Sequence, residues 1–352
     1  MSHSASPAAA PARLARLDGL RGIAACGVAF TYHTRSLFAE GALDTGIYAL
    51  DWFQLYGWLF VDMFFVLSGF IFAHVYLSRN LLTSGAGVAE FAVARFARLY
   101  PLHLLLLLAT LVLFWGKPEN TPIAFVANFL FLQALAQPPA QSFVGPSWSL
   151  TVEAACYVLF ALGAAAGPRA LRLVTGFAIA LGLIAILIHA SPAGPYARDD
   201  FPRGLLGFFL GQLLWHRRAA LARVPSWCLG AVMVAGLLVP PSLVGAILPL
   251  ALLTFPAALL LGLRTRWLES RLFVWLGDRS YAIYLIHIPV IELVVKWHGP
   301  IAGGALPVAL GLGGLIAAVL LLSELAFHTV EDPARKAIRA AWLRRENRAA
   351  LA

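Results

Sequence analysis

LDGLRGIAACGVAFTYHTR, from Leu17 to Arg35, is an apolar stretch that carries an aspartate, an arginine and a histidine. Asp18 and Arg21 are spaced i, i+3, so they share one helix face and can pair near its inner end. His33 lies about 18 Å further along if the helix is regular. Charged side chains inside a membrane are costly and usually functional. This stretch therefore predicts a first membrane-spanning helix that carries part of a functional site.

The composition of the whole chain also indicates a membrane protein. The 352 residues are 61% hydrophobic, with a mean hydropathy of +0.81 and only 12% charged residues. Soluble domains carry about 25% charged residues. The net charge of +9 could suit nucleic acid, but no basic helix with interleaved aromatic residues stands apart from an apolar segment. We therefore predict an all-α integral membrane protein that binds membrane lipid and no nucleic acid.

The apolar segments predict about ten membrane-spanning helices. One further apolar piece, 122–136, is short, and we expect it to be re-entrant or to lie at the outer interface, where protein covers its backbone. The predicted spans lie near residues 18–36, 54–77, 99–115, 149–166, 171–190, 204–216, 226–240, 243–262, 280–297 and 306–328.

The distribution of positive charge predicts how the helices are oriented. With the N-terminus in the cytoplasm and the spans alternating, most of the 26 lysines and arginines fall at or near cytoplasmic ends. A full crossing by 122–136 would move every later loop to the other side and remove this bias. Both termini are therefore expected in the cytoplasm of a multi-pass inner-membrane protein. The cations left on the outer side are Arg35, Lys117, Arg198, Arg203 and Lys296.

The chain divides into three expected parts. Residues 1–15 are expected to be disordered, and residues 16–333 form the transmembrane domain. Residues 334–352 begin with ARKAIRAAWLRRENRAA, a basic amphipathic pattern typical of a helix on anionic lipid. Cys26 and Cys156, like Cys228, lie in apolar runs without metal-site spacing, which indicates small core residues and no metal.

Polar residues in the middle of the chain each allow a functional and a structural interpretation. Asp62 stands alone in an apolar span, where an interhelical hydrogen bond is the simpler reading. Arg95 and Arg98 are spaced i, i+3 and could bind phosphates at the inner mouth of a helix, or anchor it by charge alone. Pro101, which follows them, is well placed for the first turn of that helix.

A second helix start carries a carboxylate. Pro146 and Ser147 mark the start, and Trp148 suits a membrane interface. Glu153 lies about one turn further, where it could reach the depth of His33 or act as a structural carboxylate. His33 itself could exchange protons near neutral pH, or could be a hydrogen-bonded core histidine.

The last two apolar spans carry further polar residues at helical spacing. Ser280, Tyr284 and His287 fall on one helix face at i, i+4 and i+7, and Glu324 precedes His328 by one turn. These groups could line a polar channel or hold the bundle together by hydrogen bonds.

Six of these stretches together resemble the acyltransferase-3 family of integral membrane acyltransferases. Each is weak alone, but they recur in the family's order from residue 16 to residue 333. They are RLDGLRGIA (16–24), GWLFVDMFFVLSGF (57–70), RFARLYP (95–101), PSWSLTVE (146–153), LGDRSYAIYLIH (276–287) and VEDP (330–333).

The resemblance implies transfer of an acyl group, often acetyl, from cytoplasmic acyl-CoA to a hydroxyl of a surface glycan or a small molecule. No tightly bound cofactor is implied, since acyl-CoA is a substrate. By matching motif, Arg21 and His33 fall on the family's essential arginine and histidine. Arg95 and Arg98 fall on its basic pair near the inner face, and Glu153 on the acid of its WSL motif.

One spacing departs from the family. The arginine and histidine of the first helix are usually separated by ten residues, whereas here GIAACGVAFTY contributes eleven. At 100° per residue, the extra residue would turn His33 about 120° away from the face of Arg21. We therefore predict a π-bulge between Gly22 and Tyr32, close to Gly27, a device often found at functional sites.

These observations lead to one mechanism and two alternatives. Arg95 and Arg98 would hold the CoA phosphates, and Arg21, steadied by Asp18, would orient the thioester end or the polar network of the bundle. His33 would be the general base, with Glu153 fixing its tautomer or binding the acceptor. A proton-coupled transporter of a small solute could use the same residues, and a structural scaffold would leave the buried charges unexplained. Thioester cleavage by the purified protein would separate the classes.

Overall fold

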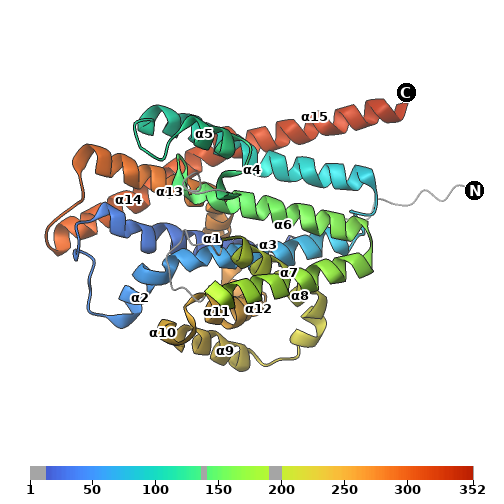
Figure 1. Ribbon diagram of the computed structural model, residues 1–352, viewed down its shortest axis with the longest axis horizontal. Coiled ribbons are helices and arrows are strands. Elements are labelled where there is room, and N and C mark those ends of the chain that lie inside the picture. The colour runs from blue at the N-terminus through green and yellow to red at the C-terminus, as the bar shows by residue number, and fades with distance from the viewer. Residues whose placement is uncertain (1–12, 136–140, 190–199, 352) are drawn as a thin grey trace, which may run out of the picture.

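The computed structural model describes residues 13–135, 141–189 and 200–351, and it is helical throughout these ranges apart from connecting loops (Figure 1). One isolated parallel bridge joins Phe38 to Ile301. Within the described residues, six helices are long and apolar enough to cross a membrane: Tyr48–Leu77, Gly85–Phe114, Gly145–Ala165, Pro168–Ile188, Arg271–His298 and Ala305–Arg348.

Four further helices complete the predicted set. Ser226–Leu238 (α9) and Ile247–Gly262, which contains α12 (Phe255–Gly262), are shorter and apolar. α1 (Ala15–Phe30) and α8 (Asp200–Leu221) are the others. Each predicted span thus contains helix, and the all-α membrane fold is confirmed.

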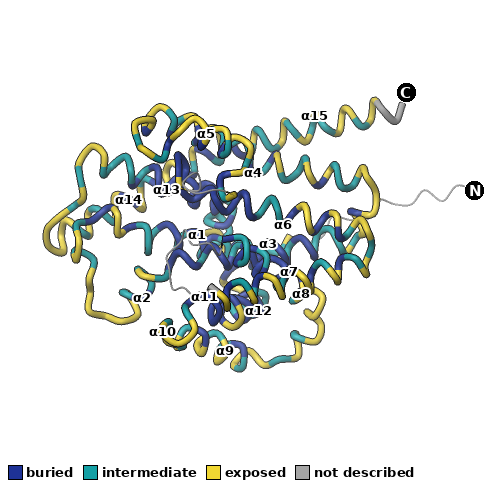
Figure 2. Tube along the Cα trace, viewed as in Figure 1, coloured by how far each residue is buried: buried dark blue, intermediate teal, exposed yellow. Residues whose placement is uncertain are grey.

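The short helix α1 lies against α13 (Arg271–His298) and α3 (Phe60–Phe72) in the buried part of the bundle (Figure 2). Its 16 residues span only about 24 Å, less than the hydrocarbon core of a bilayer. Glycine allows the close contact with α13, since a Cβ on Gly277 would lie 2.2 Å from the carbonyl oxygen of Asp18. α1 is therefore an internal helix that protein surrounds.

α1 ends in a break where a π-bulge was predicted. The helix is α-helical through Phe30, and Thr31 then adopts φ −120° and ψ −92°. Its hydroxyl donates to the carbonyl oxygen of Gly27 at 2.5 Å, and a 3₁₀ helix follows over Tyr32–Leu37. The predicted bulge is wrong, because the chain accommodates the extra residue by leaving the α-helix before His33.

α4 (Gly85–Phe114) is longer than predicted. Ser84 caps it by accepting a hydrogen bond from the backbone N–H of Gly87 at 3.1 Å. Pro101 therefore lies inside the helix and not in its first turn. Membrane helices tolerate an internal proline because neighbouring helices can satisfy the freed backbone groups.

The segment predicted to be re-entrant or interfacial is a short helix, α5 (Pro122–Phe129), followed by a 3₁₀ turn, Gln133–Leu135. Buried polar contacts tie it to the bundle: His103 Nε2 lies 2.9 Å from the carbonyl oxygen of Asn128. Gln133 donates to the carbonyl oxygen of Ser147 at 2.6 Å. An eight-residue helix is too short to cross a bilayer, in agreement with the prediction.

Two residues assigned to a membrane surface are buried. Arg203 on α8 bonds Asp62 on α3, with Nε at 3.0 Å and Nη2 at 2.9 Å from Oδ1, and both side chains are nearly inaccessible. Trp148, the first residue of α6 (Trp148–Ala165), is buried beside this guanidinium and not at an interface. Arg203 therefore does not belong to an outer loop, and Asp62 holds α3 to α8.

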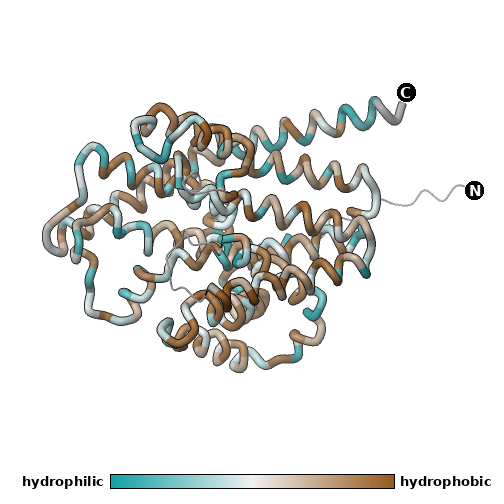
Figure 3. The backbone as a smooth tube through the Cα atoms, in the orientation of Figure 1, coloured by the Kyte–Doolittle hydropathy of each residue, from teal (hydrophilic) through white to brown (hydrophobic). Residues whose placement is uncertain are grey.

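The C-terminal part forms a bent helical arm. α14 (Ala305–Ala326) passes through a π-turn, Phe327–Glu331, into α15 (Asp332–Leu351). α15 packs along α4 and is the most hydrophilic helix in Figure 3. The helix predicted for the tail is therefore present, and it contacts the bundle.

Candidate active site

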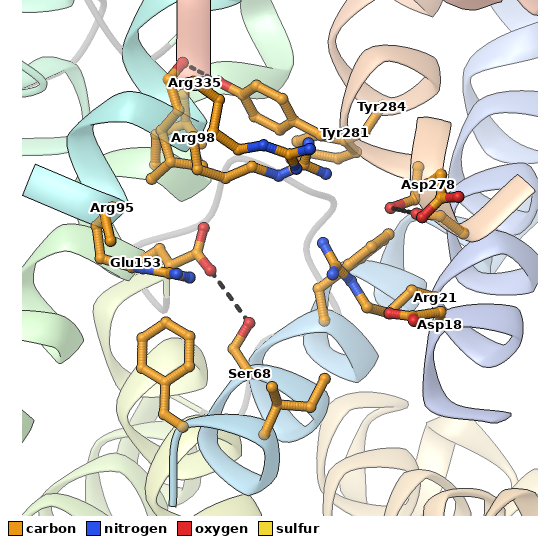
Figure 4. Close-up of a pocket in the computed structure, with 18 of the residues that line it drawn as sticks. Asp18, Arg21, Ser68, Arg95, Arg98, Glu153, Asp278, Tyr281, Tyr284 and Arg335 are labelled. Carbon is orange, nitrogen blue, oxygen red and sulfur yellow. Dashed lines mark hydrogen bonds between the residues drawn. The ribbon is translucent and has the colours of Figure 1, made fainter. Parts of the chain in front are cut away.

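A cavity of about 790 Å³ opens between α1, α3, α4, α6, α13 and α15. We call it the arginine cavity, because its lining holds seven cationic side chains and three carboxylates (Figure 4). The excess of positive charge suits an anionic ligand. The cations are Arg13, Arg21, Arg95, Arg98, Arg335, Lys336 and Arg339, and the carboxylates are Asp18, Glu153 and Asp278.

Arg21 points into the arginine cavity and away from Asp18 (Figure 4). Asp18 instead accepts from Arg13 Nε at 2.6 Å, and Arg13 also contacts Asp278 at 2.5 Å. The predicted Asp18–Arg21 ion pair is therefore wrong. In the described part of the chain Arg21 makes no ion pair, which leaves its guanidinium available to a ligand.

The two arginines of α4 have different surroundings. The guanidinium of Arg95 lies 4.8 Å from the centre of the Phe72 ring and has no carboxylate within ion-pair distance among the described residues. Arg98 Nη1 contacts Glu331 at 2.6 Å, and this carboxylate is almost fully buried. Both arginines line the cavity, so they lie on one side of α4, as their i, i+3 spacing predicts.

Glu153 is held inside the arginine cavity by two hydroxyl groups. Ser68 on α3 donates to its Oε1 at 3.1 Å, and the hydroxyl of Tyr157, one turn further along α6, donates to the same oxygen. The carboxylate is also close enough to Arg21 for electrostatic attraction. Glu153 therefore balances part of the positive charge of the cavity.

Three hydroxyl groups in the cavity wall form hydrogen bonds with one another or with the backbone. Tyr284 donates to the carbonyl oxygen of Pro146 at 2.7 Å, and its hydroxyl lies 3.0 Å from that of Ser149. Ser280 donates to the carbonyl oxygen of Gly277 at 2.8 Å. For Ser280 and Tyr284 the sequence left open a polar channel or hydrogen bonds that hold the bundle together; both side chains line this cavity and both form hydrogen bonds within the bundle.

Beyond Tyr284 lies a pair of histidines. The ring of His287 is fully buried, 6.0 Å from that of Tyr284 between ring centres. Its Nε2 lies 3.2 Å from Nδ1 of His33, which is also 3.4 Å from the carbonyl oxygen of Val28. His287 therefore sits between the arginine cavity and His33.

His33 lines a second cavity of about 490 Å³, which we call the histidine cavity. Its other lining residues come from the 3₁₀ helix that carries His33, from the second half of α13 and from the segment after α4. Among them, Lys117 and Glu292 pair at 2.7 Å. The arginine cavity instead uses the first half of α13, from Gly277 to Tyr284. The histidine pair therefore separates two cavities at opposite ends of α13.

The expected contact between Glu153 and His33 is not formed among the described residues. Glu153 lines the arginine cavity and bonds Ser68 and Tyr157. His33 lines the histidine cavity and meets His287 instead. The tautomer of His33 therefore depends on His287 and Val28, and not on Glu153.

Glu324 lies outside both cavities. It forms an ion pair with Arg279, accepts from the indole N–H of Trp275 at 2.9 Å and lies 3.0 Å from His328 Nε2. Of the two interpretations left open for Glu324, these contacts favour bundle packing. His287 matches neither interpretation fully. Its ring is buried, as expected for packing within the bundle, but it also contacts His33.

Several residues that line the arginine cavity were not predicted as site residues from the sequence. Ser68, Ser149, Asp278 and Tyr281 lie inside the quoted motifs, so their motif membership was a usable signal. The cations of α15 were assigned to lipid, because an amphipathic basic helix gives the same pattern in either place. They are Arg335, Lys336 and Arg339.

Comparison with known proteins identifies the family of this chain. The family described as "Acyltransferase domain" matches residues 14–324. The chain is 30% identical to Acyltransferase MdmB of Streptomyces mycarofaciens, over 90% of this chain and 88% of that protein. It is 24% identical to Peptidoglycan O-acetyltransferase OatA of Listeria monocytogenes, over 91% of this chain and 55% of that protein.

A further relative is O-acetyltransferase OatA of Staphylococcus aureus, 26% identical over 93% of this chain and 58% of that protein. The chain thus spans little more than half of the two OatA proteins. No solved structure matches. The family match covers most of the chain and includes α1, both arginines of α4 and Glu153, and on these grounds the chain belongs to the acyltransferase-3 family of membrane acyltransferases.

Proposed function

We propose that this protein transfers an acyl group, most simply acetyl, from acyl-CoA to a hydroxyl of a glycan or small-molecule acceptor. The observation that carries the proposal is the pair of cavities joined by contacting histidines, one strongly basic and the other reached by His33. The basic cavity suits a donor with phosphate groups, and the other gives an acceptor a separate approach.

In this proposal Arg95 and Arg98 bind the diphosphate of the donor. Planar guanidinium groups bind phosphate oxygens with two parallel hydrogen bonds. Arg21, which has no ion-pair partner in the described part of the chain, faces the bound donor in the arginine cavity and orients its thioester end toward the histidine pair. Glu153 helps to orient Arg21 by electrostatic attraction.

The histidine pair provides the proton transfers. The acceptor oxygen attacks the thioester carbonyl carbon, and its proton passes to Nε2 of His33. The new C–O bond forms and the C–S bond breaks. The proton on His33 Nδ1 then moves to His287 Nε2 across their 3.2 Å contact, and His287 releases the proton on its Nδ1 to the CoA thiolate, which gives CoA thiol. Neutral imidazoles can take and give protons in this way near neutral pH.

Orientation follows from the chemistry of the donor. Acyl-CoA is a cytoplasmic metabolite, so the arginine cavity would open to the cytoplasm and the histidine cavity to the other side. Basic residues gather at cytoplasmic ends of membrane helices, which agrees with the seven cations of the arginine cavity. Both termini would then be cytoplasmic and the acceptor would arrive from outside.

The test uses the purified protein in lipid nanodiscs with acetyl-CoA as donor and a methyl glycoside as the acceptor hydroxyl. We expect acetyl-CoA to bind and CoA thiol to be released, and Arg95→Gln to raise KM for acetyl-CoA by about tenfold or more with a smaller effect on kcat. Arg223→Gln is the matched control, because Arg223 is exposed and lies outside the cavity. Failure of the wild-type protein to bind acetyl-CoA, or equal effects of both variants, would contradict the proposal.

A further inference from the structure

Three cations of the arginine cavity come from α15, beyond residue 324, where the family match ends. They are Arg335, Lys336 and Arg339, spaced i, i+1 and i+4 on one side of the helix. Further along the same helix, Arg344, Arg345 and Arg348 do not line the cavity. If α15 served only as a lipid anchor, both sets of cations would face lipid. The position of the first set in the cavity wall therefore needs another explanation.

An ion pair fixes this end of α15 to the cavity. Glu331 precedes α15 directly, and its buried carboxylate holds Arg98 of α4 at 2.6 Å. The guanidinium of Arg98 also lies 5.6 Å from the centre of the Tyr281 ring on α13. In Figure 4 the side chains of Arg98 and Arg335 extend in the same direction toward Tyr281. The start of α15 is therefore part of the cavity wall.

The charge at this wall is only partly balanced. Asp332 contacts both Arg335 and Lys336 at 2.5 Å. Arg339 has no carboxylate within ion-pair distance among the residues described, and its side chain is exposed. The carboxylates near these three cations are Asp332 and Glu331, and Glu331 is already paired with Arg98. Positive charge therefore remains in excess, which leaves room for an anion such as a phosphate monoester.

CoA carries two separate anionic groups, a diphosphate and a 3′-phosphate on its ribose. The arginine cavity likewise holds two groups of cations, one on α4 and one on α15. We propose that Arg335, Lys336 and Arg339 bind the 3′-phosphate of the donor, while Arg95 and Arg98 bind the diphosphate. This inference rests on the proposed function and adds to it: α15 is a part of the donor site that recognises the 3′-phosphate.

The experiment compares CoA with 3′-dephospho-CoA, which lacks only that phosphate. Binding to the purified protein in nanodiscs is measured for the wild type and for Arg335→Gln/Lys336→Gln/Arg339→Gln. We expect the wild type to bind CoA about ten- to hundredfold more tightly than 3′-dephospho-CoA. The triple variant should lose this preference by weakening CoA binding, with the affinity for 3′-dephospho-CoA unchanged.

The matched control is Arg344→Gln/Arg345→Gln/Arg348→Gln, which removes the same charge from the same helix outside the cavity. It should keep the full preference for CoA. Arg339→Gln alone, at an exposed position, should reduce the preference in part and guards against misfolding of the triple variant.

The outcomes separate this inference from the proposed function. Equal binding of both nucleotides by the wild type, or equal effects of the two triple variants, would overturn the role of α15 and leave it as a lipid anchor. Binding of neither nucleotide by the wild type would instead contradict the proposed function itself.

Discussion

Arg21 and His33 belong to the same short stretch of chain, but their side chains line different cavities. In a regular helix, twelve positions rotate a side chain by about 120°, so the two residues could not share a face. The break at Thr31 changes the direction of the chain, and His33 then meets His287 on α13. Local sequence shows the mismatch in spacing, but the form of the break depends on packing against other helices.

Sequence predicted the charged residues better than their contacts. Arg95 and Arg98 share a side of α4 because helix geometry alone sets an i, i+3 pair. The predicted contact between Glu153 and His33 is not formed, because tertiary packing sets the depth of α6 relative to α1. Nothing local distinguishes Arg13 from Arg21 as the partner of Asp18, since either lies within reach of that carboxylate along the chain.

The histidine pair gives a prediction at the scale of single residues. His33→Ala should lower kcat by about 10²–10⁴-fold, because a general base contributes that much. The KM and Kd for acetyl-CoA should change little, since His33 lies outside the arginine cavity. The measurement is the release of CoA thiol by purified protein with an acceptor hydroxyl supplied as methyl glycoside.

His298→Ala is the control for this variant, because His298 is exposed at the end of α13 and lines neither cavity. Its kinetics should match the wild type. An unchanged kcat for His33→Ala would contradict the assignment, and the base would then be sought at His287.

At the scale of elements, the close packing of α1 against α13 positions both parts of the site. α1 carries Arg21, and α13 carries Tyr284 and His287. Gly277 permits the contact, because a Cβ there would lie 2.2 Å from the backbone oxygen of Asp18. A backbone oxygen cannot move aside as a flexible side chain can, so the two helices would have to separate.

Gly277→Ala should therefore lower both the melting temperature and kcat. We expect a loss of about 1–3 kcal/mol in stability, the usual cost of overpacking. The control is Gly176→Ala on α7 (Pro168–His189), where a Cβ would meet no atom within 4 Å. That change should be neutral or slightly stabilising, since alanine favours helix. If the two variants had the same melting temperature and the same kcat, the close contact between α1 and α13 would not be needed for stability or activity.

The limits of prediction at this scale are visible in α4 and α15. Pro101 was expected in the first turn of α4, yet the helix begins at Gly85, where Ser84 caps it. The apolar run that predicted the helix starts later, because charged residues occupy the first turns. The helix of α15 was predicted, but its cavity contacts depend on the π-turn Phe327–Glu331, which sets its direction. Hydropathy reports which segments are helical and apolar, and does not report the angle at which they meet.

At the scale of the whole molecule, hydropathy predicted the helices and the family motifs predicted the chemistry. Every predicted span contains helix, and the short segment 122–136 does not cross as one helix. The family assignment decides against the proton-coupled transporter, which used the same buried charges. Hydropathy alone could not separate these classes, because both need polar residues inside an apolar bundle.

The two ends of the bundle differ in charge, and this gives the last prediction. The loop Phe38–Ile47 and the loop Gly299–Gly304 lie at one end in Figure 1, and the starts of α4 and α7 lie at the other. If acyl-CoA enters the arginine cavity from the cytoplasm, the second end must be cytoplasmic. Reporter fusions after Asp44 should then be active as periplasmic alkaline phosphatase and dark as a fluorescent protein.

Fusions after Ala86, after Ala220 and at the C-terminus should show the reverse pattern, because the charge of α15 and of the α8 end favours the inside. The C-terminal fusion is the decisive one. α15 supplies cations to the arginine cavity, so the side on which it lies is also the side from which the donor arrives. A C-terminal phosphatase that is active outside the cell would place the basic cavity away from cytoplasmic acyl-CoA, and both the orientation and the assignment of that cavity to the donor would have to be abandoned.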